Sequence, residues 1–139
     1  MAKVGAVELR ELLQRTLEEV EGDQRIGPLL RASGLRLRLE CPDVGVVLNI
    51  AASQDPVRHL RWSFDDRVDW KPKLELRMDA EVANRYLQGR ESLAVAIARG
   101  RVRCRGHAHS ALLYIPAARL IAEAYRRCAR EHHPALVLD

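Results

Sequence analysis

The sequence predicts an α+β domain in which a five-stranded, mainly antiparallel sheet carries its helices on one face. Three observations predict this class. The chain opens with leucines at helical spacing, its middle alternates apolar and charged residues with a period of two, and its last quarter is helical again. Strands that follow one another through short turns form antiparallel neighbours, and helices grouped outside them cover one face of the sheet.

The first element is an amphipathic helix, expected over Ala6 to Glu21. Its apolar positions recur at intervals of three and four residues, and they are Leu9, Leu12, Leu13, Leu17 and Val20. Gly27 and Pro28 then interrupt the pattern. We expect one further helical turn at Leu29 to Ala32.

Four strands follow, expected at Leu35–Glu40, Val46–Ala51, Arg58–Phe64 and Lys73–Met78. In each, large apolar side chains alternate with charged or smaller ones, as in a strand with one buried face. The first two are joined by a turn rich in proline and glycine, and the last two by an irregular crossing. A meander of the first three strands is therefore predicted.

Helices and one more strand complete the plan. Asp79 is predicted as the N-cap of a helix over Ala80–Gln88, because its carboxylate can accept an unpaired backbone N–H. A second helix over Ser92–Arg99 and a fifth strand over Arg101–Gly106 follow. The remaining helices are expected at 109–115 and 117–131, separated by Pro116.

Length and composition bound the class of protein. With 139 residues, of which 47% are hydrophobic and 30% charged, the chain is expected to form one domain over 1–139, with its core at about 34–131. No uninterrupted apolar segment approaches the length of a membrane span. The three cysteines have no zinc-site or disulfide spacing, so free thiols and a cytoplasmic location are expected. No cofactor and no metal are expected.

The net charge of +4 comes mainly from arginine. The alternation predicts that one sheet face gathers charged side chains, mainly Arg36, Arg38, Arg61, Arg77, Arg101, Arg103 and Arg105. Such a face suits an anionic membrane surface or an anionic ligand, or it is solvated or buried in a homodimer. Nucleic acid is not expected, because Trp62 and Phe64 share the inward face and leave no exposed aromatic platform.

The motif evidence for catalysis is thin. No Gly-rich phosphate loop and no serine nucleophile elbow occur in the sequence. His107-x-His109 and His132-His133 are weak metal signals, and Asp65, Asp66 and Asp69 are expected to be turn residues. Cys104 is expected on an inward face as a small core residue. A hydrolase or acyl transferase using His107 or Cys104 is the least supported class of function.

The inward face leaves two interpretations open. Its large aliphatic side chains close into a solid core or wall a pocket, and periodicity does not distinguish these outcomes. The order of local patterns adds information: a strand followed by an acidic residue (Leu74 to Asp79), a helix that ends before Gly89-Arg90, and a Gly-Arg-Val step that leads into the last strand (Gly100 to Gly106). From about Gly34 to Tyr125 this order resembles the sterol carrier protein 2 family.

The resemblance implies a hydrophobic tunnel between the sheet and the helices that holds a fatty acid, acyl-CoA or other lipid without chemical change. The residues that would wall it are Trp62, Leu76, Met78, Val82, Tyr86, Ile97, Leu112, Leu113, Leu120, Ile121 and Tyr125. Arg101 and Arg103 would bind an acidic head group. The expected function is thus a non-enzymatic lipid carrier, and the alternative is a structural or dimerisation module that binds a protein partner through the basic face or an exposed helix.

The C-terminal residues Leu136 to Asp139 do not form a recognisable peroxisomal signal. A free-standing member of bacterial type is therefore expected.

Overall fold

The computed structural model describes residues 3–138, so Asp139 lies outside the described residues. Their helices are α1 (Ala6–Gly22), α2 (Ile26–Ala32), α3 (Ala80–Leu87), α4 (Leu93–Ala98), α5 (Ala108–Leu113), α6 (Ile115–His132) and the 3-10 helix η1 (Pro134–Leu136). The strands are β1 (Arg36–Cys41), β2 (Val46–Ala52), β3 (Leu60–Ser63), β4 (Leu74–Met78) and β5 (Val102–Gly106). Among residues 3–138, no helix combines the length and the apolar character that a membrane span requires.

The five strands form one sheet in the order β3-β2-β1-β4-β5. β1 pairs antiparallel with β2, as β2 does with β3 and β4 with β5. β1 and β4 are parallel neighbours. The prediction of a five-stranded, mainly antiparallel sheet is confirmed, and the parallel pair at the centre makes the sheet mixed.

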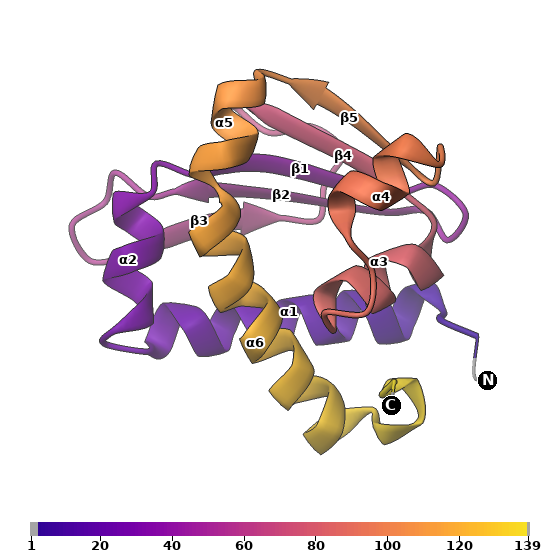
Figure 1. The fold of residues 1–139 in the computed structure, drawn as a ribbon. Coiled ribbons are helices and arrows are strands. Elements are labelled where there is room, and N and C mark those ends of the chain that lie inside the picture. Colours follow the sequence, from indigo (N-terminus) through magenta and orange to yellow (C-terminus); the bar gives the residue numbers. More distant parts are fainter. Residues whose placement is uncertain (1–2, 139) are drawn as a thin grey trace.

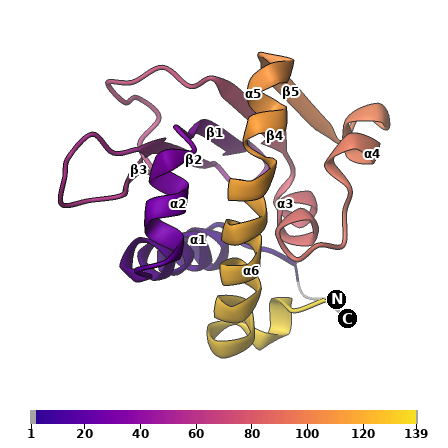
Figure 2. The same cartoon turned by 60° about the vertical axis from the view of Figure 1, so that its left-hand side comes forward.

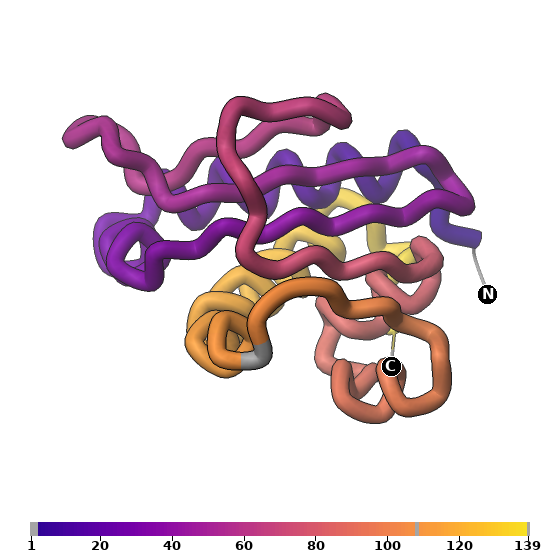
Figure 3. Tube along the Cα trace, turned by 90° about the horizontal axis from the view of Figure 1, so that it is seen from above, coloured from indigo at the N-terminus to yellow at the C-terminus, as the bar shows by residue number. Residues whose placement is uncertain are grey.

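The two faces of the sheet are covered differently. The helices lie on one face, which we call the inner face, and residues 64–73 cross the opposite, outer face on their way from β3 to β4 (Figures 1 and 3). α6 packs against α1, α2 and α3, and Figure 2 shows it standing between α2 and α3. The inner face is thus the side on which the core forms.

The apolar stripe of α1 is buried as its spacing predicts. Leu9, Leu12, Leu13, Leu17 and Val20 belong to the main core cluster. Burying one leucine side chain contributes about 2 kcal/mol, so this stripe supplies a large part of the driving force that holds α1 against the sheet and α6.

α2 is longer than the single turn predicted. It begins at Ile26, where the carboxylate of Asp23 accepts the backbone N–H of Ile26 at 2.9 Å. Pro28 lies in the first turn, where its missing N–H leaves no intrahelical bond unmade. Gly27 lies within α2 and does not interrupt it. Because it has no side chain, the ring of His59 can approach the helix at this position.

α6 begins at Ile115 rather than at Ala117, with Pro116 in its first turn. The junction of α5 and α6 is tied to the start of β1 by Tyr114. Its hydroxyl accepts the backbone N–H of Arg36 at 3.2 Å and donates to the carbonyl of Gly34 at 3.3 Å. These bonds hold α5 close to one end of the sheet.

Candidate functional site

Five of the apolar residues that the sequence predicts as cavity walls are buried in the core: Leu76, Met78, Val82, Ile121 and Tyr125. Tyr86 and Leu120 are half-buried and pack against the same cluster. The hydroxyl of Tyr125 donates to Oδ1 of Asn84 at 2.8 Å. Burial raises the pKa of Tyr125 above its ordinary value, as expected for a phenol inside the protein.

Three further predicted wall residues are exposed. The exposed fractions are 40% for Ile97 on α4, 67% for Leu112 and 56% for Leu113, both on α5. α4 and α5 flank β5 at the same edge of the sheet (Figures 1 and 3). Large aliphatic side chains are thus exposed on both helices that flank β5.

Cys104 shows where the helical cover ends. It lies directly opposite Leu76 on β4, so both side chains are on the inner face. Leu76 is 4% exposed, whereas Cys104 is exposed. The inward parity of Cys104 was predicted correctly, but its assignment as a buried core residue is wrong, because the helices cover β4 and leave this part of β5 open.

Trp62 lies away from the other predicted wall residues. It lies on β3, the edge strand farthest from β5, opposite Ile50 of β2. Its indole N–H donates to Oε1 of Gln14 on α1 at 2.9 Å. The structure therefore places it against the N-terminal helix.

The two arginines expected at a ligand head group have different surroundings. Arg101 forms an ion pair with Glu91, whose carboxylate also binds Nε of Arg85 at 3.2 Å. Arg103 is opposite Arg77 on the outer face and is exposed. Among the described residues, Arg103 is thus the one of the two that has no ion-pair partner.

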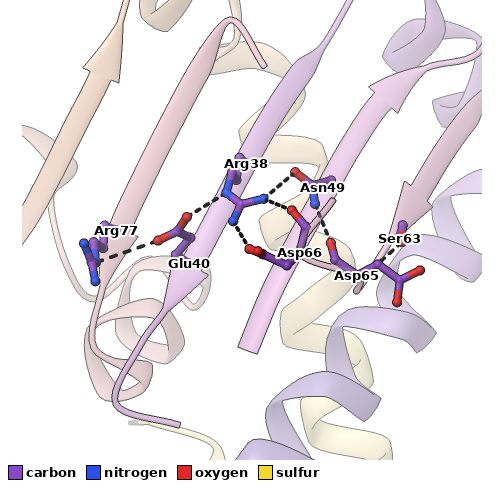
Figure 4. A network of polar contacts seen from close by, with 7 residues as sticks. All are labelled: Arg38, Glu40, Asn49, Ser63, Asp65, Asp66 and Arg77. Carbon is purple, nitrogen blue, oxygen red and sulfur yellow. Dashed lines mark hydrogen bonds and ion pairs between the residues drawn. The ribbon is translucent and has the colours of Figure 1, made fainter. Parts of the chain in front are cut away.

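The outer face is less basic than the sequence suggests, because the crossing segment supplies carboxylates. Arg38 donates to Oε1 of Glu40 at 2.6 Å, to Oδ1 of Asp66 at 2.5 Å and to the carbonyl of Asp66 at 2.7 Å. Asn49 bridges Arg38 and the carbonyl of Asp65, and Figure 4 shows this network across the strands. Asp66 is therefore more than a turn residue.

Two more arginines of the outer face have carboxylate partners: Arg61 pairs with Asp69 at 2.9 Å, and Arg77 lies 3.7 Å from Glu40. Among the described residues, the outer-face arginines without an ion-pair partner are Arg36 at the start of β1 and Arg103 and Arg105 on β5.

The histidines of the two sequence motifs have different surroundings. His107 and His109 are exposed, and His133 contacts Glu11 with 3.5 Å between Nε2 and Oε2. No group of three or more potential metal ligands occurs within residues 3–138. Partial burial raises the pKa of the Cys104 thiol, opposite to the shift that a nucleophilic cysteine requires.

A buried amide cluster escaped the sequence analysis. Asn84 on α3 and Gln88 at the C-cap of this helix both donate side-chain N–H groups to the carbonyl of Leu136, at 3.0 and 2.9 Å. Gln88 Oε1 accepts the N–H of Leu138 at 2.8 Å. Both amides lie away from the apolar stripe of the predicted helix, so helical periodicity gave no signal for their burial. They bind the C-terminal segment.

An open hollow of about 350 Å³ lies between α1 and the end of β3, lined by Val7, Arg10, Glu11, Gln14 and Phe64. None of the predicted wall residues lines it. The exposed aliphatic side chains near β5 are thus the feature that corresponds best to the predicted site.

No family model and no curated protein sequence matches this chain. Solved structures do match it. A structure described as "UbiJ-SCP2 Ubiquinone synthesis protein" has a TM-score of 0.58 at 15% identity, covering 87% of this chain and 96% of its own. The sterol carrier protein domain 2 of Helicoverpa armigera has a TM-score of 0.59 at 15% identity, covering 88% and 96%.

A third match lies inside a much larger chain. The sec-alkylsulfatase Pisa1 from Pseudomonas sp. has a TM-score of 0.51 at 12% identity, and the match covers 61% of this chain but 13% of the sulfatase. This arrangement of strands and helices therefore occurs both in small proteins and as part of an enzyme. Likeness at this level of identity establishes architecture, and the chain has the fold of sterol carrier protein 2 domains.

Proposed function

We propose that this chain is a non-catalytic lipid-binding protein of the cytoplasm that carries a fatty acid, acyl-CoA or another lipid against the inner face of β5. The observation that carries the proposal is the end of the helical cover at Cys104, together with the exposure of Ile97 on α4 and Leu112 on α5, the helices that flank β5. The fold shared with sterol carrier protein 2 domains supports it.

The physical driving force is the removal of apolar surface from water. Burial of an acyl chain contributes about 0.8 kcal/mol per CH₂ group, so a long chain is held without many specific contacts. The aliphatic side chains of α4 and α5 would be covered in the same step. The buried residues Leu76 and Met78 on β4 would form the rigid support beside the ligand.

An acidic head group needs a cation near the open edge. Arg103 is the better candidate of the two predicted arginines, because Arg101 is already bound to Glu91. Its guanidinium lies on the outer face of an edge strand, which a head group can reach by passing around that edge. A bidentate contact with a carboxylate or phosphate would fix the orientation of the lipid.

Native mass spectrometry of the purified protein, followed by solvent extraction and lipid analysis, tests the proposal. We expect acyl lipids at close to one per chain, chemically unchanged after incubation with the protein. A bare protein mass, together with no uptake of a fluorescent fatty acid, would contradict lipid binding. Recovery of a hydrolysed or transferred acyl group would contradict the non-catalytic role.

A pair of variants on one strand locates the site. Cys104→Trp fills the uncovered inner face of β5, and we expect it to lower fluorescent fatty acid uptake at least tenfold. Arg105→Trp places the same ring at the next position on the outer face and serves as the matched control. Equal uptake by the two variants, both confirmed as folded by circular dichroism, would place the ligand elsewhere.

A further inference from the structure

Residues 92–122, which we call the acid-free segment, contain five arginines, two histidines and no aspartate or glutamate. The rest of the chain then carries 18 basic and 19 acidic side chains, so the whole positive net charge comes from this segment. It comprises α4, β5, α5 and the beginning of α6. In the fold, α4, β5 and α5 lie at one edge of the molecule (Figures 1 and 3).

The same segment also concentrates exposed apolar surface. Of the eight large apolar side chains that are exposed within residues 3–138, five belong to it: Val95, Ile97, Leu112, Leu113 and Ile115. Among the described residues, only Arg101 of its five arginines has an ion-pair partner. Arg99, Arg103, Arg105 and Arg119 are exposed.

We propose that this edge is a docking surface for anionic lipid bilayers. An edge that carries both exposed aliphatic side chains and unpaired cations matches the interface of a membrane, where apolar groups enter the acyl boundary and cations meet phosphate groups. No carboxylate of the segment itself would be repelled by the same surface, and the nearest one across the strand pair is Glu75 on β4, directly opposite Arg105.

Charge complementarity favours a membrane over the other occupants. A two-fold contact between copies of this chain would bring ten arginines together without a carboxylate from either segment. A nucleic acid would meet aliphatic side chains that do not stack on bases, since the aromatic residue of the segment, Tyr114, is buried.

This inference goes beyond lipid carriage, because it concerns where the protein meets a bilayer rather than what it holds. Co-sedimentation with vesicles tests it, using vesicles of phosphatidylcholine alone and vesicles of equal parts phosphatidylcholine and phosphatidylglycerol. We expect binding to the anionic vesicles alone, weakened by added salt. Equal binding to both vesicle types, or to neither, would overturn the proposal.

Two double variants distinguish binding through this edge from a general effect of the net charge. Arg99→Gln with Arg105→Gln is expected to lower partitioning roughly thirtyfold, from about 1 kcal/mol for each arginine near an anionic surface. The control, Arg67→Gln with Arg130→Gln, removes the same charge from exposed positions outside the segment. An equal loss in both pairs would overturn the proposed location.

The apolar contribution has its own control. Leu112→Ser with Leu113→Ser is expected to lower vesicle binding at least tenfold, whereas Leu29→Ser, at another exposed leucine, leaves it unchanged. If the protein forms a concentration-dependent dimer and Leu112→Ser with Leu113→Ser abolishes it, the surface serves self-association instead. Fatty acid uptake, measured without vesicles, is expected to survive Arg99→Gln with Arg105→Gln, so failure of membrane docking and failure of lipid binding are distinguishable.

Discussion

Asp43, in the turn between β1 and β2, accepts the backbone N–H of Ala80 with 3.1 Å between Oδ1 and nitrogen. A carboxylate from a distant turn thus satisfies the first N–H of α3. Asp79, at the N-cap position, makes no side-chain bond to the helix. The predicted helix start is correct, but the predicted capping group is wrong.

We therefore expect Asp43→Ala to lower the free energy of unfolding by about 1 kcal/mol, the usual effect of losing an N-cap. Asp79→Ala, which removes a carboxylate near the same helix end, is expected to have a smaller effect. Urea unfolding followed by circular dichroism measures both. A larger loss in Asp79→Ala would show that Asp79 is the cap in solution.

The contrast between Asp43 and Asp79 shows which structural features can be predicted from neighbouring residues in the sequence. Glycine stops, the stripe of α1 and the parity of the strands all follow from near neighbours, and the structure confirms them. The partner of Ala80 lies 37 residues away, so no local pattern identifies it. The parallel pairing of β1 and β4 is likewise set by the arrangement of the whole sheet.

The site was predictable to the same extent. The alternation gave Cys104 its correct face, but the extent of helical cover depends on where α4 and α5 pack. Trp62 shares the inward face with Leu76, yet the strand order places β2 and β1 between their two strands. Parity therefore predicts the face of a side chain and not its neighbours.

The outer-face network yields a second prediction. The side chain of Arg38 is 14% exposed and contacts Glu40 and Asp66, whereas that of Arg61 is 46% exposed and contacts Asp69. We expect Arg38→Met to lower the free energy of unfolding by about 2 kcal/mol, because Glu40 keeps only the contact with Arg77 and Asp66 loses its cation.

Arg61→Met is the matched control, with an expected loss below about 1 kcal/mol for an exposed ion pair. Thermal and urea unfolding would compare the two. Equal losses would show that the crossing segment does not depend on Arg38.

The amide cluster on α3 predicts how the C-terminal segment is held. Asn84→Ala removes the acceptor of the Tyr125 hydroxyl and of the Gln88 amide, leaving buried donors unpaired. The expected loss is about 2 kcal/mol, together with faster proteolysis after Leu136. Tyr125→Phe keeps both amide bonds to Leu136, so its tail is expected to stay protected. Rapid cleavage in both variants would contradict a role for the amides in holding the tail.

The three thiols predict an order of alkylation that also reports on the ligand. Burial, with the charges of Asp43 and Asp79, raises the pKa of Cys41 to about 12. Burial and the carboxylate of Glu19 raise that of Cys128 to about 11. Because the thiolate is the reactive form, Cys41 and Cys128 hold at pH 8 only about one part in ten thousand and one in a thousand of it.

Cys104 is exposed and is therefore expected to react first with iodoacetamide, as peptide mass spectrometry would show. All three rates should rise with pH, with the buried thiols remaining far behind. If a lipid covers the inner face of β5, a bound fatty acid slows the labelling of Cys104 and leaves Cys128 unaffected. Labelling of Cys104 at the same rate with and without a bound fatty acid would place the lipid away from β5, whereas slower labelling of all three thiols would indicate a general stabilisation of the fold.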